Sequence, residues 1–185
     1  MCSGEAPPNC RILSNAFWLF VPAVSDLGLK LLPRKGMPEF LFKRVQAKLP
    51  YAFNCENPQR VSMWGQHFVF SQNESFKHLR KKSVVPVQAE TLPHENYLNA
   101  ILCQKHLCPV ELYQQPVYWA LDYALSLVQL PHFLVLSDPF CPKFQFLLEE
   151  GYYVVNPGNF GKSSQFVIIY PRQGTIWDSV LPGQR

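Results

Sequence analysis

The chain has 185 residues, 17 of them prolines, and its 17 Lys and Arg against 13 Asp and Glu give a formal net charge of +4 at pH 7. This length indicates one domain or part of one, and the prolines exclude coiled coils and helical bundles. Only 16% of the residues are charged and 48% are hydrophobic, which favours apolar faces for partner chains over a compact core beneath a Ser/Asn/Gln-rich surface.

The first half of the chain predicts short elements separated by prolines. Residues 1–15 mix Pro, Ser, Asn and Gly and are expected to form a flexible lead-in to one unit, residues 16–185. Residues 17–21 are typical of a buried strand, and Pro38 begins a helix that Pro50 ends. Alternating or apolar segments then predict strands with antiparallel pairing, at residues 51–55, 60–64 and 66–70.

The second half predicts helices followed by strands. Ser71 and Glu74 fit a capping box that opens a short helix, and Pro93 with Glu95 starts another. Residues 116–127 are apolar nearly all round, which predicts a helix buried between layers and a packing role for its tryptophan. Three strands are expected at residues 133–136, 152–155 and 165–170. The last of them is an uninterrupted apolar run, typical of a central strand.

Residues that could bind a metal are sparse and scattered. Cys103, His106 and Cys108 are close in sequence, but no second pair with zinc spacing lies nearby. Two-metal phosphoesterases use Gly-Asp, Gly-Asn-His and Gly-His-x-His turns. The one Gly-Asn pair of this chain is followed by Phe160, which cannot bind a metal. We therefore expect no metal and no metal-dependent hydrolysis.

Patterns for covalent catalysis and nucleotide binding are also missing. The sequence has no Gly-x-Ser-x-Gly elbow and no Walker or dinucleotide glycine spacing. Asp138 ends an expected strand, where sheet enzymes often keep an acid, but Asp-Pro also opens turns and we favour the turn. We therefore expect no cofactor and assign no catalytic residue.

The strongest basic patch is Arg80-Lys81-Lys82. It is typical of the solvated end of a helix, where cations complement the helix dipole. A net charge of +4 is mild for a nucleic-acid-binding domain. We therefore expect these three residues to make at most a weak contact with DNA.

Nothing in the sequence indicates a membrane span or a disulfide framework. The longest apolar stretches, residues 16–24 and 123–136, are short and each is broken by a proline. The apolar run after Arg11 could pass for a signal peptide, but an acidic residue and two prolines precede it instead of basic residues. Six irregularly spaced cysteines favour reduced thiols in an intracellular compartment, with a secreted cysteine-containing module as an alternative.

Four segments of the sequence form a distinctive set of motifs: residues 116–125, residues 134–138, the turn at 156–160 and Tyr170-Pro171. Together these motifs resemble the B-subunit family of DNA polymerase epsilon. Weaker matches extend the resemblance over residues 16–181, and the relatives of polymerases alpha and delta fit less well. The family motif and packing residues assigned in this way are Pro116, Tyr118, Trp119, Asp122, Tyr123, Asn156, Pro157 and Gly158.

The resemblance implies an α/β fold, the C-terminal part of a calcineurin-like phosphoesterase domain that has lost its metal ligands. Such a part would be an incomplete layered sandwich with mixed or antiparallel strands and flanking helices. Asn57 and Pro58 would stand where active relatives have Gly-Asn-His, and Asn156 to Phe160 where they have Gly-His-x-His. His106 would be the one surviving histidine.

The function that the resemblance implies is a non-catalytic accessory subunit acting in nuclear DNA replication. Its partner would be the C-terminal region of the polymerase epsilon catalytic subunit, with other replisome subunits, and any DNA contact would be weak or indirect. Two alternatives are the corresponding accessory subunit of polymerase alpha or delta, and a metal-dependent phosphoesterase completed by residues outside this chain.

Overall fold

The computed structural model describes residues 15–26, 28–83, 92–148 and 151–181. The expected lead-in, residues 1–15, lies outside these ranges except for its last residue. In chain order the elements are β1 (Trp18–Phe20), α2 (Glu39–Gln46), β2 (Ala52–Asn54), β3 (Gln59–Met63), β4 (Gln66–Ser71), α3 (Ser75–Lys82), α4 (Pro93–Gln104), η1 (Trp119–Leu125), β5 (Phe133–Leu136), β6 (Phe144–Leu147), β7 (Tyr153–Asn156), α5 (Phe160–Ser163), β8 (Gln165–Tyr170) and β9 (Thr175–Val180).

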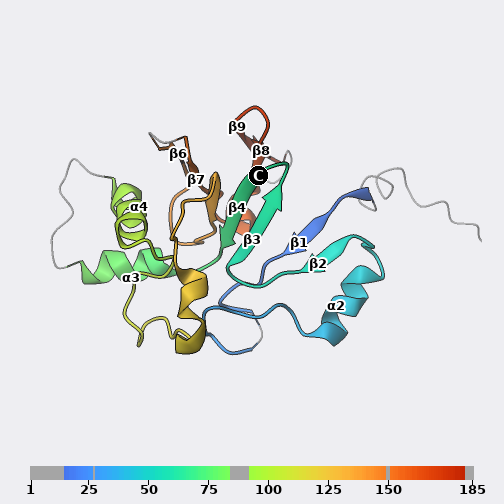
Figure 1. Ribbon diagram of the computed structural model, residues 1–185, viewed down its shortest axis with the longest axis horizontal. Coiled ribbons are helices and arrows are strands. Elements are labelled where there is room, and N and C mark those ends of the chain that lie inside the picture. The colour runs from blue at the N-terminus through green and yellow to red at the C-terminus, as the bar shows by residue number, and fades with distance from the viewer. Residues whose placement is uncertain (1–14, 27, 84–91, 149–150, 182–185) are drawn as a thin grey trace, which may run out of the picture.

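A mixed five-stranded sheet forms the centre of the molecule, with the strand order β3-β4-β5-β7-β6. Strands β4, β5 and β7 are parallel, whereas β3 and β6 run antiparallel to their neighbours at the two edges. Helices α3 and α4 lie to one side of this sheet, and β1, β2 and α2 lie to the other (Figure 1). The expected α/β class, with mixed strands and flanking helices, is confirmed, and the phosphoesterase-like sandwich stays a prediction.

The two faces of the sheet carry different side chains, because successive residues of a strand point to opposite faces. Val69, Leu134 and Val154 belong to one face and join the main core cluster, which also contains Tyr97 and Ile101 of α4. The other face carries a ladder of stacked rings, with centroids 4.8 Å apart for Phe68 and Phe133 and 5.1 Å apart for Phe133 and Tyr153. The first face thus packs against helix α4, and the second face consists of stacked aromatic side chains.

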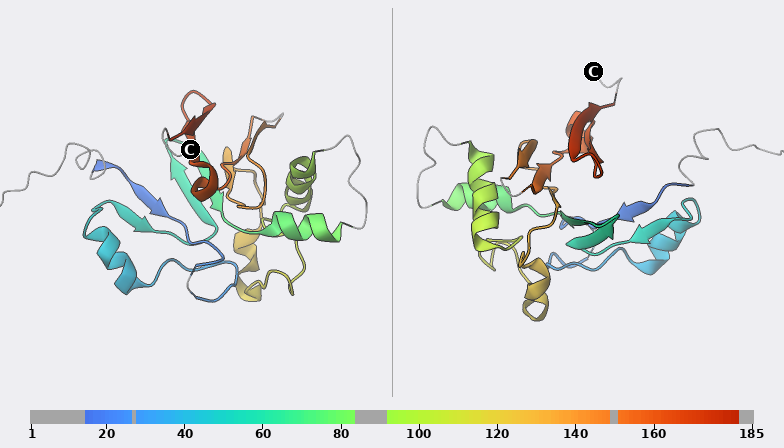
Figure 2. Two further views of the ribbon diagram at one scale, coloured as in Figure 1. Left: turned by 180° about the vertical axis from the view of Figure 1, so that it is seen from behind. Right: turned by 45° about the horizontal axis from the view of Figure 1, so that its top comes forward.

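Strands β8 and β9 form a separate antiparallel hairpin over the aromatic face. Asp178 of β9 accepts hydrogen bonds or ion pairs from Lys143 and from Gln145 of β6, and the Tyr153 hydroxyl donates to the Gly174 carbonyl. The hairpin stands away from the five-stranded sheet in the tilted view of Figure 2. The prediction that residues 165–170 form a central strand is wrong, because β8 pairs on one edge only within the described residues.

The N-terminal part forms a small unit of its own. Strands β1 and β2 pair in parallel, and Phe42 of α2 packs edge-on against Phe20 with ring centroids 6.2 Å apart. Phe17 and Leu19 are exposed, so the expected strand at residues 17–21 exists but is not buried. Phe17 and Leu19 lie on the opposite face from Phe20, and no described element covers that face.

The prediction of a buried helix at residues 116–127 is wrong. The Leu32 amide donates to the Pro116 carbonyl and the Tyr118 amide donates to the Leu32 carbonyl, so this segment starts as an extended bridge and only Trp119–Leu125 forms a 3-10 helix. Leu125 is fully buried, whereas Trp119 is 76% exposed and Tyr123 is 72% exposed. Trp119 and Tyr123 therefore face outward, and the predicted packing role of Trp119 is wrong.

Of the two helix starts predicted from the sequence in this region, one is confirmed and one is wrong. The helix begun by Pro93 exists as α4, with the Glu95 carboxylate accepting the Leu92 amide at 3.3 Å. Ser71 does not cap α3, because it is the last residue of β4 and α3 starts at Ser75. Within the described residues, no helix is long and apolar enough to cross a membrane.

Candidate functional site

The candidate site lies where the parallel strands β4, β5 and β7 end. Gln72, Asn73 and Asp138 lie in the loops that follow β4 and β5, and Asn156 is the last residue of β7. Asn57 lies two residues before the start of β3, at the same edge. In open α/β sheets, ligands bind in the crevice at the carboxyl ends of the parallel strands. This edge also holds the positions that resemble the degenerate turns of phosphoesterases.

The Asn57 side chain is fully buried and bonded on both its amide atoms. Its amide nitrogen donates to the carbonyls of Pro22 at 3.0 Å and Gln72 at 2.6 Å, and its oxygen accepts the Gln72 amide at 3.1 Å. Its own main chain exchanges two hydrogen bonds with Arg34. Asn57 thus ties three loops together and has no atom left to bind a ligand, and its neighbour Pro58 offers no polar side chain.

Asn156 plays the same part on β7. Its amide nitrogen donates to the carbonyls of Asp138, Cys141 and Pro142 at 3.1–3.3 Å, and its oxygen accepts the Gly158 amide at 3.3 Å. The turn needs a residue without a side chain at 158, because its φ of +79° lies in the left-handed region. This arrangement holds the loop after β5 against the turn after β7.

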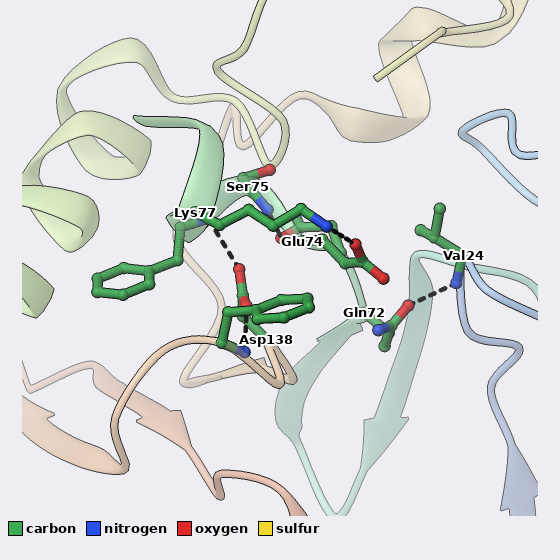
Figure 3. Close-up of polar contacts among 9 residues, drawn as sticks. Val24, Gln72, Glu74, Ser75, Lys77 and Asp138 are labelled. Atoms are coloured by element: carbon green, nitrogen blue, oxygen red, sulfur yellow. Dashed lines mark hydrogen bonds and ion pairs between the residues drawn. The ribbon is translucent and has the colours of Figure 1, made fainter. Parts of the chain in front are cut away.

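Asp138 caps helix α3 from a different element (Figure 3). One carboxylate oxygen accepts the Phe76 amide in the first turn of the helix at 2.8 Å, and the other accepts the Phe140 amide at 2.9 Å. Burial raises the pKa of this carboxyl above its usual value, although these main-chain donors act in the opposite direction. The predicted turn at Asp138-Pro139 is confirmed, since the Cys141 amide donates to the Asp138 carbonyl at 3.3 Å.

The polar side chains of the loop after β4 are bonded in the same way. Gln72 accepts the Val24 amide at 2.6 Å, and Glu74 forms an ion pair with Lys77, as Figure 3 also shows. The Asn73 side chain donates to the Leu107 carbonyl at 2.8 Å and accepts from the Tyr97 hydroxyl at 3.2 Å. No sequence argument singled out Asn73 or Gln72, although a run of amides and acids directly after each parallel strand was a visible signal.

His106 lies at the end of α4 and bonds through both ring nitrogens. Its Nε2 lies 3.3 Å from a carboxylate oxygen of Asp122, and its Nδ1 accepts the Cys108 amide at 3.2 Å. The histidine therefore fastens η1 to the end of α4. In the part of the chain that the structure describes, no three His, Cys, Asp or Glu residues come together in a way that could hold a metal ion.

A pocket of about 640 Å³ opens beside this edge, between the five-stranded sheet and β8. Phe70, Val135 and Val155 form its floor, and Val167 and Ile169 of β8 form its opposite wall. Gly158 and Phe160 also line the pocket, and Phe160 is exposed. The pocket is thus mostly apolar, and the buried amides and carboxylate of the edge do not point free atoms into it.

The basic patch at the end of α3 is partly neutralised. Lys82 lies 3.2 Å from a carboxylate oxygen of Glu111 and 4.0 Å from the ring centroid of Tyr113. Arg80 and Lys81 are exposed in the last turn, as expected for cations at the negative end of the helix dipole. Two of the three proposed DNA contacts therefore remain available at the surface.

Comparison with known proteins gives a consistent answer. The family model for the B subunit of DNA polymerase alpha/epsilon matches residues 9–145. The chain belongs to this family. It is 32% identical over 174 residues to the B subunit of DNA polymerase epsilon from Arabidopsis thaliana and 33% identical over 175 residues to DNA polymerase epsilon subunit 2 of Homo sapiens. These alignments cover 92% and 93% of this chain, and the resemblance predicted from the motifs is confirmed.

The matched length is a clear difference from those relatives. The chain spans about a third of the length of the curated relatives it matches, since the two alignments each cover 33% of the relative. The B subunit of DNA polymerase epsilon from Saccharomyces cerevisiae is more distant, at 24% identity over 192 residues. The family is therefore established for this chain, while the activity and partners of the whole subunit are not.

Proposed function

We propose that this chain is a non-catalytic accessory component of the DNA polymerase epsilon complex, acting as a scaffold in nuclear DNA replication. The observation that carries the proposal is the state of the sheet edge. Asn57, Asp138 and Asn156 lie where a sheet enzyme would keep its reactive groups, but their side chains are bonded to the main chain. The edge serves to hold loops together.

The lack of catalysis follows from the donors that a two-metal phosphoesterase needs. Such a centre requires carboxylates, histidines and amides that converge on ions about 4 Å apart. Asp138 is 1% exposed, so to reach an ion it would have to turn away from the Phe76 and Phe140 amides. His106 would have to leave either Asp122 or the Cys108 amide. Moving Asp138 would leave the buried Phe76 amide without an acceptor, and moving His106 would break its bond to the Cys108 amide. A buried main-chain group left without a partner costs about 1–3 kcal/mol.

The partner is proposed to be the C-terminal region of the polymerase epsilon catalytic subunit, together with other replisome subunits. Exposed aromatic residues support a protein partner, because such residues are enriched in interfaces. Phe17, Tyr51 and Phe53 gather on the open face of β1 and β2, with Phe17 and Tyr51 ring centroids 5.6 Å apart. Trp119 and Tyr123 add a second exposed set on η1. DNA contact is proposed to be weak and confined to Arg80 and Lys81.

Co-expression tests the proposed partner. The 185-residue chain is co-expressed with the tagged C-terminal region of the catalytic subunit of polymerase epsilon, and in parallel with the corresponding regions of polymerases alpha and delta. We expect recovery with epsilon only. Recovery with alpha or delta alone would assign the chain to that polymerase, and recovery with none would overturn the proposal.

A separate assay tests the absence of catalysis. The purified chain and the purified complex are given Mn²⁺ and a generic phosphodiester, and we expect no turnover above the buffer rate. Turnover that follows the protein through purification and disappears in His106→Ala would support the phosphoesterase alternative instead.

A further inference from the structure

One edge of strand β8 has no partner among the described residues. The Leu181 amide donates to the Ser164 carbonyl at 3.0 Å, which makes these two residues a hydrogen-bonded pair at the start of the hairpin. Bonded and non-bonded pairs alternate along an antiparallel ladder. The register Gln165↔Val180 therefore directs the main-chain groups of Gln165, Val167 and Ile169 away from β9. These residues present a row of donors and acceptors at the outer edge that bond to nothing in the part of the chain that the structure describes.

The same three residues line the apolar pocket. Their side chains all point to one face of the hairpin, and that face forms the pocket wall opposite Phe70 and Val135. Since β9 is bonded to β6 through Asp178, β8 lies over the middle of the sheet and its open edge is directed toward β4. The open edge of β8, with its outward-facing main-chain donors and acceptors, therefore lies beside an apolar cavity of about 640 Å³. Their combination fits a polypeptide strand.

A second copy of this chain does not fit this place. If two β8 strands paired antiparallel to each other, both five-stranded sheets would lie on the same side of the joined hairpins. The two sheets would then occupy the same layer and collide. In a parallel pairing the second copy would face the other way, and its Val167 and Ile169 would point away from the pocket. The occupant must be an extended segment that has no sheet of its own beneath it.

Charge adds a further property of that segment. Lys162 and Arg172 lie just before and just after β8, and both are exposed. Asp178, the one acid of the hairpin, is already bonded to Lys143 at 2.8 Å. A segment with acidic residues at its two ends would meet a cation at each end of the groove.

We propose that β8 and the pocket beneath it form a strand-addition groove for an extended segment of a partner protein, with apolar residues at alternate positions and acidic residues at its ends. The added strand bonds to the main chain of Gln165, Val167 and Ile169, and its apolar side chains fill the pocket above Phe70 and Val135. This mode of recognition gives affinity through the main chain and specificity through the pocket. The groove does not depend on which complex the chain joins.

A designed peptide tests the groove. The probe is a fluorescent peptide of sequence Glu-Val-Thr-Val-Thr-Val-Glu, which keeps its side-chain order in either direction, and its anisotropy is measured against the 185-residue chain. Two matched controls carry N-methyl groups on all three valines or on both threonines. Antiparallel addition uses the valine amides and parallel addition uses the threonine amides. We expect one control to lose binding at least about tenfold and the other to bind as the parent does.

Protein variants and hydrogen exchange complete the test. Val167→Pro removes an amide that faces the open edge and leaves the ladder to β9 intact, so it lowers affinity at least about tenfold. Val135→Phe fills the pocket from the five-stranded sheet, without changing the sequence of β8, and has the same effect. Val128→Phe, at a position that is 80% exposed, has none. Peptide binding slows exchange at the amides of Val167 and Ile169 and not at those of Phe166 and Ile168.

Three outcomes overturn the proposal. The first is equal binding, or equal loss of binding, by the two methylated peptides. The second is an unchanged affinity in Val135→Phe with no new protection at Val167 and Ile169. The third is a concentration-dependent dimer, measured by light scattering, that Val167→Pro dissolves and the peptide does not, since that result would assign the edge to a second copy.

Discussion

Replacing Asp138 with alanine removes the group that joins β5 to helix α3. Both carboxylate oxygens are bonded, one to the Phe76 amide at 2.8 Å and one to the Phe140 amide at 2.9 Å. Phe76 is buried, so its amide finds no water in the variant, whereas the half-exposed loop at Phe140 allows water to replace the lost acceptor. The two lost bonds are therefore unequal in cost.

The magnitude follows from this difference. A buried main-chain amide without a partner costs about 1–3 kcal/mol, and an amide that gains a water partner costs about 0.5–1 kcal/mol. We expect Asp138→Ala to lower the free energy of unfolding by about 2–3 kcal/mol, which corresponds to a fall in melting temperature of roughly 5–10 °C for a chain of this size. Asp26→Ala is the matched control, because Asp26 accepts a single amide, that of Ala23 at 2.8 Å, in an exposed turn. It should cost about 0.5–1 kcal/mol.

The pH dependence gives an independent check. Burial raises the pKa of Asp138 above its usual value of 3.8. A raised carboxyl pKa in the folded state adds stability that is fully present below the unfolded pKa and is lost as the pH rises through the folded pKa. Asp138→Asn cannot titrate, so the stability difference between wild type and Asp138→Asn should be larger near pH 4 than near pH 7.

Urea unfolding followed by tryptophan fluorescence measures both effects at several pH values. A cost for Asp138→Ala that is no larger than the about 0.5–1 kcal/mol expected for Asp26→Ala would refute the assignment of Asp138 as a cap of α3. A difference between wild type and Asp138→Asn that grows with pH would show that the carboxylate is stabilised in the folded chain, and that burial is not the dominant influence.

Three further predictions concern the surface and the thiols. Trp119→Ala should change the stability of the isolated chain by less than about 0.5 kcal/mol, because the ring is 76% exposed, while weakening recovery of the complex in the co-expression assay. Arg80→Glu with Lys81→Glu should leave complex recovery unchanged and abolish any salt-sensitive DNA binding, and persistent binding measured by electrophoretic shift would exclude this patch. Iodoacetamide at pH 8 should modify the exposed thiol of Cys103 long before the buried thiols of Cys108 and Cys141. Burial raises the pKa of Cys108 to about 11 and that of Cys141 to about 12, so both stay protonated at pH 8. Peptide mapping by mass spectrometry gives the order of modification.

Many of the strands could be predicted from the sequence, because they are short alternating or apolar segments bounded by Pro, Gly and Asn. Strands β2, β3, β4, β5 and β7 lie within one residue of the expected ranges. The position of a strand in a sheet could not be predicted in the same way. The apolar run of β8 suits a central strand, but it pairs on one edge only within the described residues, since pairing depends on segments far apart in the sequence.

The outward orientation of η1 shows a second limit. An apolar count over residues 116–127 cannot tell an inward residue from an outward one, because the one charged residue of the segment, Asp122, is bonded to His106 and does not by itself mark the exposed side. Leu125 and Leu127 are fully buried, and Trp119 and Tyr123 are not. The roles of Asn57 and Asn156 were beyond prediction for a related reason, because their hydrogen-bond partners lie on other loops and no local pattern specifies them.

The state of the sheet edge also determines what a restored ligand could do. Placing histidines at the turns that the family resemblance predicts to be degenerate, as in Pro58→His with Phe160→His, adds two imidazoles but no carboxylate. Asp138 remains bonded to the Phe76 and Phe140 amides. Two histidines without a bridging acid cannot hold two hard divalent ions close together. We therefore expect the double variant to show neither Mn²⁺ binding by calorimetry nor turnover of a phosphodiester. Mn²⁺-dependent turnover in this variant would mean that the edge can release its polar groups, and the structural role assigned to Asn57, Asp138 and Asn156 would then be wrong.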